Sequence, residues 1–382
     1  LEVTNQILDQ YYGSLVDVIA QARRRTPDQV RAAIDTGPFV GESAVNAGLV
    51  DKLLFEDQAY GELKDRIHLE IRKIGEQDYL AARADSDSGP KIAFIAADGD
   101  ITRGSEHSSD ASGGITSIDM VKTLRDVAGD SSIKGAILRI DSPGGDGIAS
   151  DDILHAAKDL SSKKPVIISM SDLAASGGYF IAVTGDPIIA YPNTLTGSIG
   201  VFFGKPVLKG LYDKIGVDID TLKRGKFADI DTTTRPLNDE ERAKLRTELE
   251  GFYRRFVERV AAGRKRPYDQ IEPLAQGRAW TGEQAKQNGL VDDLGGIDLA
   301  IDLIKQRAKI GASDKVTLVA YPPKQTIWDV LFSRSDESAD FESAIARRLV
   351  LSHTRALTRN LPIHALMHGG ILELLPYSIE VK

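Results

Sequence analysis

Residues 135–147 read GAILRIDSPGGDG, and residues 165–178 read PVIISMSDLAASGG. In both stretches a short apolar run, typical of a buried strand, is followed by a glycine-rich turn and then by a helical pattern. The same alternation continues outward, with strand patterns at 92–97 and 188–191 and helical patterns at 118–127, 147–160 and 177–183. This order predicts an α/β fold with a mostly parallel sheet and helices on its faces. Both glycine-rich turns then fall just beyond the carboxyl ends of strands, where such sheets place their binding sites.

The composition excludes several classes of protein. Of the 382 residues, 42% are hydrophobic and 27% are charged, which is typical of a globular chain rather than a disordered one. The formal net charge of −8 disfavours nucleic acid as a partner, because nucleic-acid binding needs an excess of positive charge. There is no cysteine, and the six histidines form no HExxH or similar ligand pair. We therefore expect no metal and no other cofactor.

A long internal repeat organises the chain. The pattern Gly-Glu-x-Ala-x3-Gly-Leu-Val-Asp-x-Leu at 41–53 recurs at 282–294, an offset of 241 residues, and 15 of the 43 positions in 11–53 are identical at that offset. We interpret the chain as four segments: residues 1–79 as the C-terminal remnant of a first repeat, 80–90 as a linker, 91–312 as a complete second repeat, and 313–382 as a C-terminal extension with an amphipathic helical pattern at 341–358. The front of the first copy is expected upstream of Leu1.

Ser176 is the candidate nucleophile in the second turn. Its small neighbours permit a tight turn, and we expect them to leave the hydroxyl reachable at the start of a helix. The Gly177 N–H at that helix start, together with the Gly144–Gly145 pair of the first turn, suits a developing negative charge. An isolated Ser-Gly-Gly is more often a simple helix N-cap, but two such turns on neighbouring strands favour a nucleophile flanked by oxyanion donors. A buried Ser176 oxygen would contradict this interpretation.

A serine nucleophile needs a general base. His155 lies in the helical pattern after the first turn, and nothing in the sequence brings it to Ser176 or supplies an acidic residue to orient it. A lysine can serve instead if burial lowers its pKa from ~10.4 toward neutrality.

Three ordered motifs resemble those of signal peptide peptidase A, the protease IV family. They are Ser-Pro-Gly-Gly at 142–145, Ala-Ala-Ser-Gly-Gly-Tyr at 174–179 and Thr-Leu-Thr-Gly-Ser-Ile-Gly at 194–200, and the likeness continues through Trp-Thr-Gly at 280–282 and Gly-Leu-Val-Asp at 289–292. The internal repeat is similar to the long, tandem form of that family. The resemblance implies a ClpP/crotonase-like fold of stacked ββα units.

The resemblance also implies a serine endopeptidase with a Ser–Lys dyad that degrades cleaved signal peptides and other apolar peptides. It implies a homo-oligomer, a tetramer in the family, on the extracytoplasmic (periplasmic) face of the bacterial inner membrane, attached through an N-terminal segment. Carried over by motif, Ser176 resembles the nucleophile and Ser198 the hydroxyl that orients the lysine. The N–H groups of Gly145 and Gly177 resemble the oxyanion hole.

The general base is where the chain departs from the family. In the short form the lysine precedes an Asp-Ile pair, and here residues 224–230 read RGKFADI, with Ala228 at the lysine position. In the long form the first copy supplies the lysine, and the 241-residue offset puts that position upstream of Leu1. Lys226 is the fallback base, because it shares a face with Ala228 if the segment is extended, and Lys223 ranks below it.

Two other functions stay open. The departure at the lysine position motivates one alternative to the peptidase, a non-catalytic scaffold or assembly protein on the same fold. An acyl-CoA enzyme on this fold is the third alternative, since it also uses backbone N–H oxyanion donors but would not need Ser176.

Overall fold

The computed structural model describes residues 1–76, 78–79, 89–104, 114–322 and 371–374. The chain divides into two compact units, Leu1–Ser88 and Gly89–Lys382, which are described separately. Most of the expected linker and the helical pattern expected at 341–358 lie outside the described residues.

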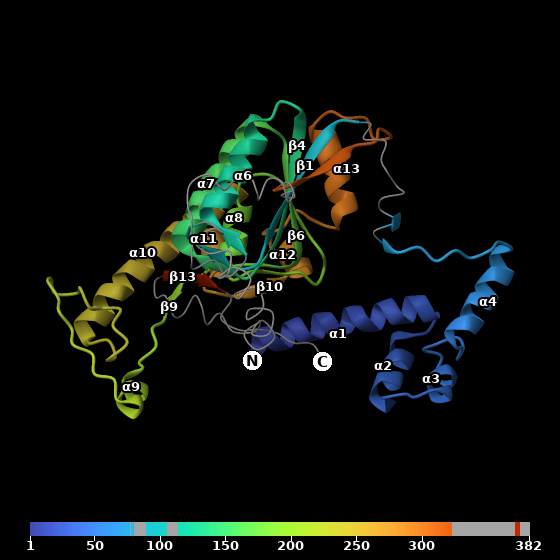
Figure 1. Cartoon of the computed structure of the whole chain (residues 1–382), viewed down its shortest axis with the longest axis horizontal. Coiled ribbons are helices and arrows are strands. Elements are labelled where there is room, and N and C mark those ends of the chain that lie inside the picture. The colour runs from blue at the N-terminus through green and yellow to red at the C-terminus, as the bar shows by residue number, and fades with distance from the viewer. Residues whose placement is uncertain (77, 80–88, 105–113, 323–370, 375–382) are drawn as a thin grey trace. The chain divides into compact units, whose positions relative to one another are not determined.

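The second unit is built on a parallel sheet with strand order β10-β8-β6-β4-β1-β12, in which β7 pairs with β6 and β11 pairs with β7 (Figure 1). Only the β10–β8 pairing in this sheet is antiparallel. The strands are β1 (Lys91–Asp98), β4 (Ile133–Ser142), β6 (Val166–Ala175), β7 (Ile188–Ala190), β8 (Leu195–Gly197), β10 (Ala279–Thr281), β11 (Asp293–Leu294) and β12 (Thr317–Tyr321). The predicted α/β class is therefore confirmed.

Helices cover both faces of this sheet. Alternate side chains of each strand point to opposite faces, and both sets are apolar, so both faces are buried. On β4, Leu138 and Ile140 join the larger core, whereas Ile137 joins a smaller core on the other face. The larger core is covered by α6 (Ser117–Gly129), α7 (Gly147–Lys163), α8 (Gly177–Ala182) and α10 (Asp239–Arg264), and the smaller by α13 (Ile297–Arg307). A sheet buried on both faces explains why its strands are continuous apolar runs.

A second, smaller sheet lies beside the first, with strand order β3-β2-β5-β13-β9. Its strands are β2 (Ile101–Thr102), β3 (Ile115–Thr116), β5 (Gly144–Asp146), β9 (Phe202–Phe203) and β13 (Ile371–Leu374). The sequence did not predict this sheet, because strands of two to four residues are too short to show a period. Its central strand β5 is the first glycine-rich turn itself.

The predicted boundary at residue 312 does not coincide with a structural border. Strand β12 falls in the expected C-terminal extension, yet it pairs in parallel with β1 from Lys91↔Thr317 to Ile95↔Tyr321. It belongs to the main sheet because β1 would otherwise present an open edge. The remaining elements of this unit are α9 (Lys209–Ile215), α11 (Tyr268–Ile271), the 3-10 helix η1 (Glu272–Leu274) and α12 (Gly282–Gln287).

The first unit is helical in its described part, with α1 (Glu2–Arg23), α2 (Pro27–Thr36), α3 (Glu42–Asn46) and α4 (Glu56–Ile67). Its small core joins Val16 and Ala20 of α1 to Val30 of α2. Thr26 starts α2 with a capping box, in which its side chain accepts from the Gln29 N–H and the Gln29 side chain accepts from the Thr26 N–H. Local capping therefore supports a unit that has little core.

Candidate active site

Ser176 is the single residue between the end of β6 and the start of α8. Its backbone has φ 53° and ψ −117°, a conformation that costs a non-glycine residue about 1–3 kcal/mol. The turn is held by the Ser176 N–H, which donates to the Gly197 carbonyl at 2.8 Å, and by the Phe180 N–H, which donates to the Ser176 carbonyl at 2.8 Å. Although Ser176 occupies the N-cap position, its side chain accepts no hydrogen bond from the helix. A capping role therefore does not explain this serine.

The expectation of a reachable hydroxyl is wrong for this conformation. Ser176 is 0% exposed, and its Oγ is buried without a hydrogen-bond partner in the part of the chain that the structure describes. The physical reason is that every residue of α8 is buried, with the Tyr179 hydroxyl donating to the Leu290 carbonyl at 2.7 Å. A buried hydroxyl without a partner costs about 1–3 kcal/mol, so it calls for a functional explanation.

The two glycine-rich turns pack directly against each other. A Cβ placed on Gly177 would lie 3.0 Å from the Gly145 nitrogen, and a Cβ on Gly178 would lie 2.5 Å from the Ser142 carbonyl oxygen. On the far side, a Cβ on Gly145 would lie 2.0 Å from the Ile101 carbonyl oxygen. These contacts require glycine, because any side chain would push the turns apart. The structure thus brings Gly145 and Gly177 together beside Ser176.

Side chains that the sequence analysis did not single out fix the relative position of the turns. Asp141 Oδ1 accepts from the Leu173 N–H at 3.2 Å, which ties the end of β4 to β6. Burial, and then the charge of Asp172, raises the pKa of Asp141. The Ser142 hydroxyl accepts from the Gly144 N–H at 3.2 Å. Asp141 could have been suspected from its place at a strand end, but its bond to the next turn depends on sheet register.

Ser198 lies close to the candidate nucleophile through β8, whose last residue Gly197 bonds to Ser176. Its backbone has φ 48°, its N–H donates to the Arg278 carbonyl at 2.8 Å, and the residue is 2% exposed. Ser198 also lines a cavity of about 290 Å³ with Gly200, Val201, Phe202, Tyr253, Gln276 and Gly277. A cavity therefore borders the predicted active site at Ser198.

The structure does not bring the fallback lysine to Ser176. Lys226 Nζ pairs with Glu240 at 2.8 Å, with both side chains more than half exposed, and Lys223 Nζ pairs with Asp229 at 2.6 Å. Residues 226–231 form turns rather than the extended segment on which the fallback depended. His155 is exposed on α7 and bears no relation to the buried serine.

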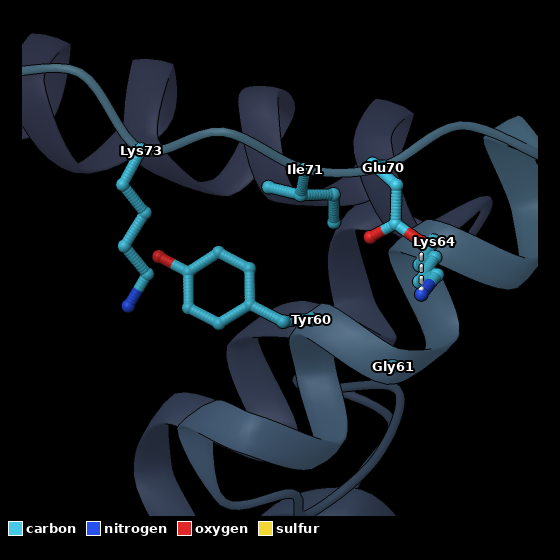
Figure 2. A pocket seen from close by; sticks show the side chains of 6 residues that line it. All are labelled: Tyr60, Gly61, Lys64, Glu70, Ile71 and Lys73. Carbon is cyan, nitrogen blue, oxygen red and sulfur yellow. Dashed lines mark ion pairs between the residues drawn. The ribbon is translucent and has the colours of Figure 1, made fainter.

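A second cavity, of about 300 Å³, lies in the first unit (Figure 2). It is lined by Tyr60, Gly61, Lys64, Glu70, Ile71 and Lys73. Lys64 pairs with Glu70 at 2.6 Å, and a hydrogen bond to Glu56 raises the pKa of Lys73. Both amines are thus paired with carboxylates, so neither is free to act as a base in this cavity.

The sequence matches the family model described as Peptidase family S49 over residues 1–70 and 158–311, more than half of the chain. The chain belongs to peptidase family S49. The match includes Ser176 and Gly177, and both parts of the internal repeat fall inside it. This membership confirms the resemblance to signal peptide peptidase A.

Curated relatives of this S49 member carry protease names. The chain is 36% identical over 343 residues to "Serine protease SPPA, chloroplastic" of Arabidopsis thaliana, covering 86% of this chain and 50% of that protein. It is 32% identical over 346 residues to "Protease 4" of Salmonella typhi, covering 86% of this chain and 54% of that protein. The chain thus spans about half the length of these relatives.

Among solved structures, a ClpP1 mutant from Listeria monocytogenes matches with a TM-score of 0.36 and 17% identity, over 55% of this chain and 94% of that chain. Because this likeness is weak, the α/β assignment of the S49 chain rests on its sheet topology. In its described residues, no helix is both long and apolar enough to cross a membrane.

Proposed function

We propose that this chain carries the nucleophile of a serine endopeptidase and that Ser176 is that nucleophile. The observation that carries the proposal is the strained backbone of Ser176 at a strand–helix junction, flanked by the converging backbones of Gly145 and Gly177. Strain of this kind persists where surrounding structure enforces it, and it clusters at active sites. Membership of peptidase family S49 supports the same chemistry.

The proposed reaction follows from these positions. Ser176 Oγ attacks the carbonyl carbon of a peptide bond while its proton passes to a neutral amine. The N–H groups of Gly145 and Gly177 donate to the oxyanion of the tetrahedral intermediate. The protonated amine then gives its proton to the leaving nitrogen, and water hydrolyses the acyl-enzyme with the same amine as base.

The proposed general base is a lysine from outside the residues that the structure describes. Three observations support this source: Ser176 Oγ lacks a partner, Lys226 and Lys223 are held by carboxylates, and the relatives are about twice as long as this chain. Ser198, close to Ser176 through β8, is proposed to orient the incoming amine. A lysine enclosed in this apolar interior would have its pKa lowered by desolvation, as a base requires.

The proposed substrates are cleaved signal peptides and other apolar peptides at the periplasmic face of the bacterial inner membrane. Support comes from a relative in Enterococcus faecium named "Putative signal peptide peptidase SppA", 36% identical over 49% of this chain. Residues 1–79 are proposed to be part of a first repeat, with a homo-oligomer, such as a tetramer, as the assembly. Membrane attachment is proposed to come from outside the described residues.

A non-catalytic scaffold is the second candidate, and the burial of Ser176 Oγ favours it. A fluorophosphonate probe applied to the whole protein separates the two. We expect the probe to label Ser176, and we expect Ser176→Ala to abolish labelling and lower peptide hydrolysis by about 10³-fold or more. Ser162→Ala, which removes an exposed hydroxyl at the end of α7, is the matched control and should label like the parent protein.

Failure to label Ser176, or labelling that survives Ser176→Ala, contradicts the peptidase proposal and favours the scaffold. Thioester turnover that survives Ser176→Ala would instead favour the acyl-CoA alternative.

A further inference from the structure

The strand that ends at the candidate nucleophile, β6, is irregular close to its end. It lies beside β4 in the main sheet (Figure 1), and their pairing is interrupted between Ile140↔Met170 and Ser142↔Ala174. One residue of β4 lies between these two pairs, whereas three residues of β6 do, so β6 contains two residues more. We call residues 171–173 the β6 bulge. Because side chains alternate with a period of two, two extra residues leave each side chain on its own face and instead bend and shift the end of the strand.

The β6 bulge is also the place where the strand changes its neighbour. Before the bulge, residues 168–169 pair with β7, and from its last residue onward residues 173–175 pair with β8. The end of β6 therefore takes its position from β8 and from the end of β4. That end carries the site, because Ala174 pairs with Ser142 of the first glycine-rich turn and the next residue but one is Ser176.

Side chains hold the peptide groups of the β6 bulge where the strand pairing is interrupted. The Asp141 carboxylate of β4 accepts from the Leu173 N–H at 3.2 Å. On the other side, the Thr194 hydroxyl donates to the Ser171 carbonyl at 2.5 Å and accepts from the Tyr191 N–H at 2.9 Å. Thr194 is 1% exposed, so its hydroxyl bonds join the connection between β7 and β8 to the bulge inside the protein. Loss of either side chain would leave a backbone group of the bulge without this partner.

We infer that Asp141 and Thr194 are positioning residues for the proposed reaction: by holding the β6 bulge they set the place of Ser176 against the N–H groups of Gly145 and Gly177. The inference rests on the proposed function for the identity of Ser176 as the nucleophile. Both side chains act through the backbone of the bulge. Oxyanion donors act only at the correct distance, and a misplacement of about 1 Å can cost about 100-fold in rate.

The first experiment compares two changes at position 194 in the whole protein. Thr194→Val keeps the shape of the side chain and removes the hydroxyl, whereas Thr194→Ser keeps the hydroxyl. We expect Thr194→Val to lower kcat for peptide hydrolysis by about 10–100-fold with KM within about threefold, since oxyanion contacts are made in the transition state. Thr194→Ser should retain kcat within about threefold of the parent protein. Equal kcat values in the two variants, or a change confined to KM, would overturn the inference.

The second experiment makes the same comparison at position 141. Asp141→Asn keeps an oxygen that can accept from the Leu173 N–H, and Asp141→Ala removes it. Burial, and then the charge of Asp172, raises the pKa of Asp141, so loss of the charge should be tolerated better than loss of the acceptor. We expect kcat to fall about tenfold or more in Asp141→Ala and to stay within about threefold in Asp141→Asn. An equal fall in both variants would contradict the role given to this hydrogen bond.

A matched control separates positioning from general stability. The Asp292 carboxylate also accepts from a strand N–H of the main sheet, that of Ile188 in β7, at 2.7 Å. Asp292→Ala should lower the Tm at least as much as Asp141→Ala does, because it also removes the partner of Arg264. At a temperature where both variants are folded, Asp292→Ala should keep kcat within about twofold. A kcat loss equal to that of Asp141→Ala would assign the effect to destabilisation and overturn the inference.

Amide hydrogen exchange tests the positioning without relying on catalysis. The Ser176 N–H donates to the Gly197 carbonyl, and we expect its exchange to be about tenfold or more faster in Thr194→Val and Asp141→Ala than in Thr194→Ser and Asp141→Asn. If the fluorophosphonate probe never labels Ser176 while this exchange result holds, the peptidase proposal fails and the role of the bulge stands. If Ser176 is labelled but exchange and kcat are the same in all four variants, the peptidase proposal stands and this inference fails.

Discussion

The two copies of the repeat share a sequence pattern but differ in what they build. At the 241-residue offset, α1 matches the body of α10, α2 matches α11 with η1, α3 matches α12, and α4 matches α13. Strands β10 and β11 exist only in the second copy, and the matching residues 38–40 and 52–53 form no strand. A helix closes its hydrogen bonds within itself, whereas a strand needs a neighbour. Here β10 and β11 have β8 and β7 to pair with.

The matching apolar side chains are also less buried in the first unit than in the second. Val16 and its counterpart Val257 are both fully buried, but Leu15 is 52% exposed where Phe256 is 0% exposed. Phe256 packs against Phe180 of α8, with ring centroids 4.9 Å apart. The repeat thus encodes a set of helices with an apolar face, and the sheet of the second unit is what covers that face.

The largest expected difference in the free energy of unfolding comes from truncating the side chains of Phe256 and its counterpart Leu15. Phe256→Ala should lower the free energy of unfolding of the second unit by about 3–5 kcal/mol, because it opens a cavity in the core. Leu15→Ala should change the first unit by no more than about 1 kcal/mol, because half of that side chain is already exposed. Hydrogen exchange along a denaturant series reports each unit separately. Similar losses in the two units would break the comparison.

A smaller difference is expected at an ion pair that both copies contain. Arg264 is 9% exposed and pairs with Asp292 at 2.5 Å, while its counterpart Arg23 pairs with Asp51 at 2.7 Å with both side chains more exposed. Arg264 also donates to the Gly289 carbonyl at 3.0 Å. Arg264→Ala should destabilise the second unit by about 1–3 kcal/mol, because it removes charge-assisted hydrogen bonds.

The matched change Arg23→Ala should cost about 1 kcal/mol or less, as for an exposed pair. Arg264→Lys is the control, since it keeps the charge and loses the forked guanidinium. The same denaturant series measures all three variants. An Arg23→Ala loss as large as that of Arg264→Ala would contradict the assignment of the first pair to the surface.

The smallest expected effect is a pH dependence confined to the second unit. A hydrogen bond from Lys223, and then one from Arg235, lowers the pKa of Asp229 to about 2, and a hydrogen bond from Arg235 lowers the pKa of Glu241 to about 2. Because both pKa values are depressed on folding, the stability they contribute is present above about pH 4.5. It is lost as pH falls toward 2.

Asp229, Arg235 and Glu241 all lie in the second unit, so the effect should be local to it. Pepsin cleavage within 204–238 should rise as pH falls from 4.5 to 2, ahead of cleavage in the main sheet. Arg235→Ala should leave that segment open at every pH in the range. Unchanged protection of 204–238 down to pH 2 would contradict the role given to this cluster.

Much of the main sheet could be predicted because its strands are buried on both faces. The runs at 135–140 and 165–170 are continuous and apolar, and they correspond to β4 and β6. Strand β4 extends two residues further at each end, and β6 extends five residues further at its C-terminal end. The helical patterns at 118–127 and 147–160 became α6 and α7. Ser176 and the two glycine-rich turns stood out for the same reason, since they interrupt these runs at strand ends.

Long-range packing accounts for what could not be predicted. Gly144–Asp146 reads as a turn and becomes a strand only because β2 and β13 pair with it. The local sequence around Ser176 reports a tight turn but not what later packs over the hydroxyl. The prediction that Lys226 could serve as the base assumed an extended segment. In the structure that segment forms turns, and Arg235 pairs with the carboxylates of Asp229 and Glu241 beside it.

The pairing of β1 with β12 sets an order of events during synthesis. Lys91 finds its partner on one side in Ile133, but its partner on the other side, Thr317, leaves the ribosome more than 200 residues later. At ordinary translation rates of about 5–20 residues per second, the β1 edge stays open for roughly 10–50 s. A nascent chain with an exposed aliphatic edge is prone to associate with its neighbours on the polysome. This period of exposure ends when β12, the last strand of the main sheet in chain order, has emerged and paired with β1.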